Sequence, residues 1–140
     1  MGLGRKSLYS NTTGSNNTVI GQEALLSNLN GSCNVSLGSQ AGYSSTGDSS
    51  VYIGNKAGFF ETEGNRLYIE NSDADADSAL IYGEFDNNIL AFNANVGIGT
   101  TNPGHDLHVI GDAFLRDTLR ATLTLQTADN NKDQVGKPHQ

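Results

Sequence analysis

An apolar residue followed by glycine recurs through the first half of the chain. The pairs are Leu3-Gly4, Ile20-Gly21, Leu37-Gly38 and Ile53-Gly54, spaced 17, 17 and 16 residues apart. Around each glycine, positions −3, −1, +3 and +5 are mostly apolar or small, and the residues between them vary. Because alternate side chains of a strand share a face, this pattern predicts two short strands per repeat with those four positions facing inward.

The inward set includes an alanine at position +3 in three repeats: Ala24, Ala41 and Ala57. The same pattern places four large apolar residues on the outside, namely Val19, Leu25, Tyr52 and Phe60. A coil of two strands encloses a core only one side chain thick, and so small a core stabilises a chain weakly. The thin core and the outward apolar residues together predict a homotrimer, in which the chains cover one another.

A second series of glycines marks turns between the repeats. Gly14, Gly31, Gly47 and Gly64 are spaced 17, 16 and 17 residues apart, within stretches rich in Asn, Ser and Thr. Glycine accepts positive φ, and Asn or Ser side chains bond nearby backbone, so these stretches favour turns. Strand, bend, strand and turn in about 17 residues predict a coil of a β-solenoid. A meander of β-hairpins also fits this spacing, but the fixed glycine–alanine pattern favours stacked coils.

Three repeat units carry a resemblance to known families: VIGQEALLSNLNGSCN, LGSQAGYSSTGDSS and IGNKAGFFETEGNR. They resemble the head repeats of trimeric autotransporter adhesins and, more closely, repeats of phage and phage-like tail fibres. The resemblance covers residues 2–66 and implies a left-handed parallel β-roll with three chains side by side. Downstream, GIGTTNP followed by LHVIGD also resembles tail-fibre sequence. The first repeat departs from the pattern, with Ser7 in place of alanine and Arg5-Lys6 after Gly4.

The all-β prediction divides the chain into four parts. Residues 1–66 form a solenoid of four coils, and residues 67–111 form a small β cap or connector. Residues 112–127 form a β stalk, since their threonines favour strand over helix, and residues 128–140 form a disordered tail. Because Met1 falls within a repeat, we expect a fragment of a longer chain. The strands expected in the cap are Leu67–Glu70, Leu80–Phe85, Ile89–Phe92, Asn95–Ile98 and Leu107–Ile110, with a hairpin turn at Asp86-Asn87-Asn88.

Composition narrows the possible partners. The 140 residues carry 15 acidic and 8 basic side chains, for a net charge of −7. Nucleic acids and anionic membranes attract clustered Lys and Arg, so neither is an expected partner. No apolar run approaches the ~18 residues that a membrane-spanning helix needs, so no membrane insertion is expected. A single cysteine, Cys33, allows neither a disulfide within the chain nor a cysteine metal cluster.

One acidic stretch has the spacing of a calcium loop. Asp73, Asp75 and Asp77 alternate, and Glu84 stands at the twelfth place counted from Asp73. However, Ser78 occupies the sixth place, where an EF-hand needs glycine, and no helices are expected on either side. We therefore expect an acidic, solvated turn and no bound metal, with these three aspartates as the candidate ligands if a cation binds.

Other chemistry is weakly represented. His105 and His108 are three residues apart, so on a strand they point to opposite faces and one chain cannot chelate a metal with both. Three copies of one histidine could still meet on a threefold axis, whereas a polar surface role is the ordinary interpretation. No catalytic serine or cysteine motif and no phosphate loop appears, so we expect no enzyme and no cofactor. Sequons at Asn11, Asn16, Asn30 and Asn34 are expected by chance in so Asn- and Ser-rich a sequence.

These observations favour a structural and receptor-binding fragment of a trimeric fibre. It would attach a phage or phage-like particle to a target cell, outside the cell, with fibre or baseplate proteins as neighbours and a surface glycan or protein as receptor. Repeated turns would bind by avidity. The candidate receptor-binding residues are Asn11, Asn16, Asn17, Asn28, Asn30, Asn34, Ser45 and Asp48.

Three other functions compete with this one. The chain could be the head of a bacterial cell-surface adhesin, or a purely structural fibre shaft. An ice-binding solenoid needs a regular outward row of threonines. The −2 positions expected outward, Gly2, Val19, Ser36 and Tyr52, form no such row.

Overall fold

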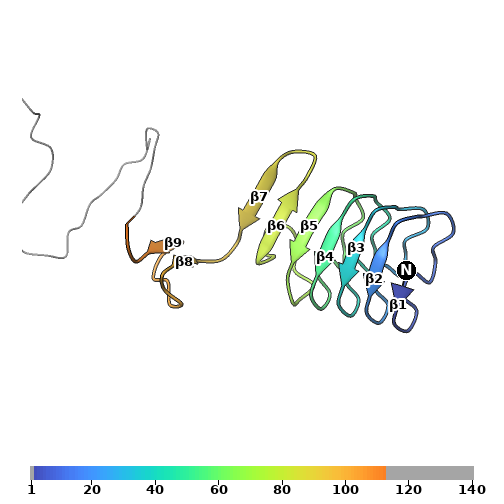
Figure 1. Cartoon of the computed structure of the whole chain (residues 1–140), viewed down its shortest axis with the longest axis horizontal. Coiled ribbons are helices and arrows are strands. Elements are labelled where there is room, and N and C mark those ends of the chain that lie inside the picture. The colour runs from blue at the N-terminus through green and yellow to red at the C-terminus, as the bar shows by residue number, and fades with distance from the viewer. Residues whose placement is uncertain (1, 113–140) are drawn as a thin grey trace, which may run out of the picture.

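The computed structural model describes residues 2–112, and its regular structure there is all-β without helix. Seven short strands form one sheet in chain order, as Figure 1 shows, and two more form a separate parallel pair. The strands are β1 (Gly2–Leu3), β2 (Thr18–Ile20), β3 (Val35–Leu37), β4 (Val51–Ile53), β5 (Arg66–Ile69), β6 (Ile81–Glu84), β7 (Ile89–Phe92), β8 (Val96–Ile98) and β9 (Leu107–Val109).

Strands β1 to β5 stack in parallel, one per turn of the chain. Val19 lies beside Ser36, Ser36 beside Tyr52, and Tyr52 beside Tyr68, so equivalent residues of successive turns form straight columns. This arrangement is a β-solenoid of about four turns, which confirms the predicted stacking and excludes a hairpin meander in this part of the chain. The parallel stack runs on to β5, beyond the last predicted repeat.

The predicted faces of these strands were wrong by one residue. The middle residue of each three-residue strand points inward, so Val19, Ser36 and Tyr52 are fully buried. The flanking positions −3 and −1, predicted inside, lie on the outer face; Ile20 and Ile53 are exposed there. Side chains alternate with a period of two, so a shift of one residue exchanges the faces. Ala24, Ala41 and Ala57 are buried as predicted, and Phe60 is exposed as predicted.

The predicted second strand of each coil is instead a run of turns. In the second coil Glu23 and Leu25 have φ of 57° and 46°, which breaks the extended conformation and the alternation of faces. Leu25, predicted outside, therefore turns inward and is fully buried. The turns still stack, because the Leu25 amide donates to the Ala41 carbonyl of the next coil at 3.0 Å.

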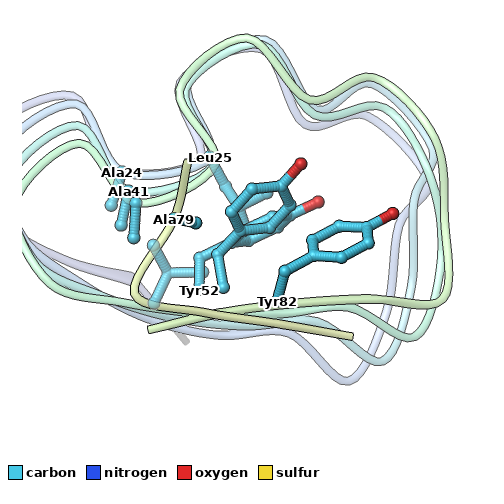
Figure 2. Close-up of a cluster of buried hydrophobic side chains, with 9 residues drawn as sticks. Ala24, Leu25, Ala41, Tyr52, Ala79 and Tyr82 are labelled. Atoms are coloured by element: carbon cyan, nitrogen blue, oxygen red, sulfur yellow. The ribbon is translucent and has the colours of Figure 1, made fainter. Parts of the chain in front are cut away.

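Three tyrosines belong to the core inside the coils, two of which, Tyr52 and Tyr82, are labelled in Figure 2. Tyr52, Tyr68 and Tyr82 follow one another along the axis, with ring centroids 6.0 Å and then 5.1 Å apart. Gly42 and Gly58 take the place of Leu25 in the later coils, and an added Cβ at either would lie within 2.6 Å of the Tyr52 ring. Glycine at these two positions therefore makes room for tyrosine on the facing strand.

After β5 the chain reverses, and β6 and β7 extend the same sheet in antiparallel fashion. The turn at 86–88 joins them as the predicted hairpin, and each of the five strands predicted after Gly64 lies within one residue of its expected bounds. Ala79 and Tyr82 carry the core beyond the last coil. The predicted stalk, apart from Asp112, and the predicted disordered tail lie outside the described residues.

Candidate receptor-binding surface

The eight candidate receptor-binding residues divide into buried and exposed groups. Four are buried, namely Asn17, Asn28, Asn34 and Ser45, and Asn11 is partly buried. Asn16, Asn30 and Asp48 are exposed. Only the exposed group presents its side chains to a partner in this structure, so the turns offer fewer polar contacts than their composition indicates.

The buried asparagines bond the backbone of the coils. Asn34 Nδ2 donates to the Gly47 carbonyl, and Asn34 Oδ1 accepts from the Ser50 amide, both at 2.9 Å. Asn17 bridges its neighbours in the same way, donating to the Gly31 carbonyl at 2.8 Å and accepting from the Asn34 amide at 2.9 Å. Together they form a ladder along the solenoid that satisfies buried backbone groups.

Asn28 and Ser45 have comparable internal roles. Asn28 closes its own turn, since its Oδ1 accepts from the Gly31 amide at 2.7 Å. Ser45 Oγ accepts the hydroxyl of Tyr52 at 3.0 Å. Burial raises the pKa of Tyr52, so its hydroxyl stays protonated and continues to donate.

The exposed turn residues are held by neighbouring coils. Asp48 accepts a hydrogen bond from the Ser32 amide at 2.6 Å, and Asn30 lies at 3.5 Å from the Thr12 hydroxyl. Asn16 has a φ of 58°, and the equivalent residues Cys33, Ser49 and Asn65 have φ values of 62°, 58° and 61°. The turn is thus a repeated backbone shape with a different side chain in each coil.

The outer face of the seven-stranded sheet is apolar. Pairing aligns one row of outward residues across all seven strands: Leu3, Ile20, Leu37, Ile53, Ile69, Ile81 and Phe92. A second row holds Thr18, Val35, Val51, Leu67, Gly83 and Leu90. Leu3, Leu90 and Phe92 are 63%, 58% and 53% exposed. We call these two rows the outer sheet face. The face contains one threonine, Thr18, and so lacks the threonine row of an ice-binding surface. The sequence argument reached the same result from the −2 positions, which in fact point inward.

The aspartates of the calcium-like spacing lie between β5 and β6. Asp73, Asp75 and Asp77 are exposed, whereas Ala74 and Ala76 between them pack against the core. The alternation therefore places alanines inward and carboxylates in solvent. Lys56, from the preceding coil, lies 3.6 Å from Asp73 and supplies a basic neighbour that is distant in the sequence.

Within residues 2–112, no three side chains of His, Cys, Asp or Glu are grouped to hold a metal ion. We predict that excess Ca²⁺ raises the melting temperature by at most a few degrees, because the three aspartates do not converge and stabilisation grows only as RT ln(1 + [L]/Kd). Differential scanning calorimetry with Ca²⁺ and with EDTA checks this. Unfolding on chelation would show that the segment is a structural metal site.

The two described histidines lie closer together than the strand argument predicted. His105 precedes β9 and is not part of the strand, so the rule of alternate faces does not separate it from His108. Their ring centroids are 6.5 Å apart, and His108 Nδ1 accepts from the Gly104 amide at 3.2 Å.

A hollow opens where the fourth coil meets the segment between β5 and β6. It is lined by Gly58, Phe60, Glu61, Tyr68, Ala74, Asp75 and Ala76. Tyr68 donates its hydroxyl to Glu61 Oε2 at 3.0 Å, and burial together with the Glu61 charge raises the pKa of Tyr68. The sequence contained one signal for this site, because its two residues break the repeat. The other coils have Ser at the position of Phe60, and Asn or Ser at the position of Glu61.

Two carboxylates near the hairpin are tied down by hydrogen bonds. Glu70 accepts from the Leu80 and Asn71 amides, which lowers its pKa. Glu84 accepts from Asn87 and from the Tyr82 hydroxyl, which lowers its pKa, while burial and this bond raise the pKa of Tyr82 to about 12. These groups fasten the segment between β5 and β7 and stay in one protonation state near neutral pH.

The described residues contain no helix long and apolar enough to cross a bilayer. Comparisons of the whole chain with protein-family models, with curated proteins and with solved structures find no match.

Proposed function

We propose that the chain is part of a trimeric fibre that attaches a phage or phage-like particle to a target cell surface, by binding and without catalysis. The observation that carries the proposal is the outer sheet face. A soluble monomer rarely exposes so continuous an apolar surface. Burial against two further copies would remove it from water, and coils stacked in straight columns suit the rigid shape that a fibre needs.

The repeat units support the choice of three copies and of a fibre, because they resemble tail-fibre and trimeric adhesin repeats. Neighbouring fibre or baseplate proteins would then hold the trimer at the particle surface. The exposed turn residues Asn16, Asn30 and Asp48 would be presented three times around the axis. Weak contacts to a glycan or protein receptor would add through this multivalency.

A purely structural shaft is the second candidate, and one observation favours it. Four of the eight turn residues expected to contact a receptor are buried in the coil instead, where three bond the backbone and Ser45 accepts from the Tyr52 hydroxyl. If the chain is instead the head of an adhesin on a bacterial cell, it would form the same trimer through the same outer sheet face.

The oligomer is tested with a variant of the outer sheet face. Sedimentation equilibrium of the native chain should give about three times 14.8 kDa. Ile53→Asp should give a monomer, because a charge buried between chains without a partner is strongly unfavourable. Phe60→Ser is the matched control: it also removes an exposed apolar side chain, but away from the outer sheet face, and should leave the trimer intact. A folded native monomer or dimer would contradict the proposal.

Attachment is tested on intact bacteria with a fluorescently labelled trimer and flow cytometry. Saturable labelling of at least one strain in a diverse panel is expected, with loss of labelling for the monomeric Ile53→Asp chain. Periodate treatment of the cells would abolish binding to a glycan, and protease treatment would abolish binding to a protein. A trimer that labels no strain would favour the shaft over the attachment function.

A further inference from the structure

The hollow beside Phe60 differs chemically from the rest of the solenoid surface. Two aromatic side chains, Phe60 and Tyr68, and two carboxylates, Glu61 and Asp75, line it together with small residues. Neither Lys nor Arg is among the lining residues, and within residues 2–112 neither carboxylate belongs to an ion pair. The hollow is therefore both apolar and negatively charged.

The fold explains Glu61 but leaves Phe60 unexplained. Glu61 Oε1 accepts from the Thr62 and Glu63 amides at 2.9 and 2.8 Å, and its Oε2 accepts from Tyr68, so this side chain fastens the coil. Phe60 is 68% exposed and stands where the other three coils have serine. Among the described aromatic residues its ring contacts only Phe59, in a T-shaped pair with centroids 4.9 Å apart. A large apolar side chain held in water at one break in a repeat indicates a contact with something outside the coil.

The lining also limits the ligand through its hydrogen-bonding capacity. Carboxylates only accept hydrogen bonds, and the Tyr68 hydroxyl already donates to Glu61. A sugar hydroxyl could donate to Asp75, but none of these side chains has a hydrogen left to donate to the sugar in return. A cation is attracted by the carboxylates and by the negative faces of the aromatic rings.

We propose that this hollow binds a quaternary ammonium group of the choline type. Such a group has no N–H to satisfy, whereas a primary ammonium would bring three donors to a site where Glu61 is already occupied. Aromatic side chains combined with carboxylates are the chemistry that recognises quaternary ammonium ligands. The inference rests on the proposed attachment function, for which it names the chemical group displayed by the target surface. None of the lining residues belongs to the outer sheet face, so burial of that face does not by itself bury them.

Titration of the native protein with choline chloride, followed by NMR and isothermal calorimetry, tests the site. Saturable binding is expected, with shifts confined to the lining residues. Phe60→Leu keeps an apolar side chain but removes the ring, and Asp75→Asn removes one charge. Each should weaken binding about tenfold. Asp77→Asn is the matched control, because it removes an equal charge from the same segment outside the hollow and should bind as the native chain does.

Two further ligands complete the experiment. They are ethanolammonium and the neutral tert-butyl analogue of choline. Binding of the neutral analogue as tight as that of choline, tighter binding of ethanolammonium, or no binding of choline would each overturn the assignment. The labelled trimer on cells separates this result from the wider proposal. If choline does not bind but the trimer labels cells, the ligand assignment fails and the attachment function stands. If choline binds but no cell is labelled, the site stands and the attachment function fails.

Discussion

Replacing Gly38 with alanine should cause a large loss of stability, although it adds only one methyl group. A Cβ at this position would lie 2.2 Å from the carbonyl oxygen and 2.6 Å from the carbonyl carbon of Gly54 in the next coil. The φ of 142° is one that residues with side chains rarely adopt. Backbone strain costs about 1–3 kcal/mol, and overpacking adds about 1–3 kcal/mol. Together they remove much of the 5–15 kcal/mol by which a typical domain is stable.

The overlap at Gly38 cannot be relieved by a change of rotamer, because it involves backbone on both sides. A Cβ added at Gly21 would likewise lie 2.1 Å from the Gly38 carbonyl oxygen, so the close approach repeats along the stack. Urea denaturation followed by circular dichroism measures the effect at one fixed protein concentration, since assembly also contributes to apparent stability. Gly104→Ala is the control. Apart from the adjacent residues, no atom lies within 4 Å of a Cβ there, so the stability of this variant should equal that of the native protein. Equal midpoints for the two variants would show that the coils stack less closely than the structure indicates.

The repeat period and the stacked coils could be predicted because every coil must place the same shape above its neighbour. Glycine before the bend and alanine after it are forced by close packing, and both columns are plain in the sequence. The inward face could not be predicted from the same pattern. Strands β2 to β4 have only three residues each, with apolar side chains at both ends except at Thr18, and the middle residue varies from Val19 to Ser36 to Tyr52. Polarity therefore indicated the wrong face.

The outer sheet face explains that failure in physical terms. Apolar residues at positions −3 and −1 are typical of a core in a monomer, and the prediction assigned them to the core of one chain. In this fold they form a second apolar surface outside the coil. The inner position holds a serine in one coil and, where glycine faces it, a tyrosine in another. Leu25 was assigned to the wrong side for another reason, because a positive φ in a leucine has no signature in the sequence.

The turn asparagines show a similar limit. Asn28 and Asn30 are two residues apart in one turn and identical in type, yet the first is fully buried and the second is exposed. Composition indicates a polar turn but does not distinguish a side chain that caps the backbone from one that faces solvent. The hollow beside Phe60 was detectable only as a break in the repeat, since Tyr68 and Asp75 join it through folding of distant segments.

Replacing Asn34 with alanine should destabilise the solenoid strongly, although asparagine looks like a turn residue of low consequence. The substitution leaves the buried Ser50 amide without its acceptor and the Gly47 carbonyl without its donor, and each loss costs about 1–3 kcal/mol. The bulk of the side chain also disappears from a fully buried position. Asn30→Ala, in contrast, removes an exposed side chain with one long contact to Thr12 and should change stability by less than about 0.5 kcal/mol. Urea denaturation of both variants at equal concentration measures the difference. A stable Asn34→Ala protein would mean that the Ser50 amide and the Gly47 carbonyl find other partners, such as water, and that the asparagine ladder contributes little to stability.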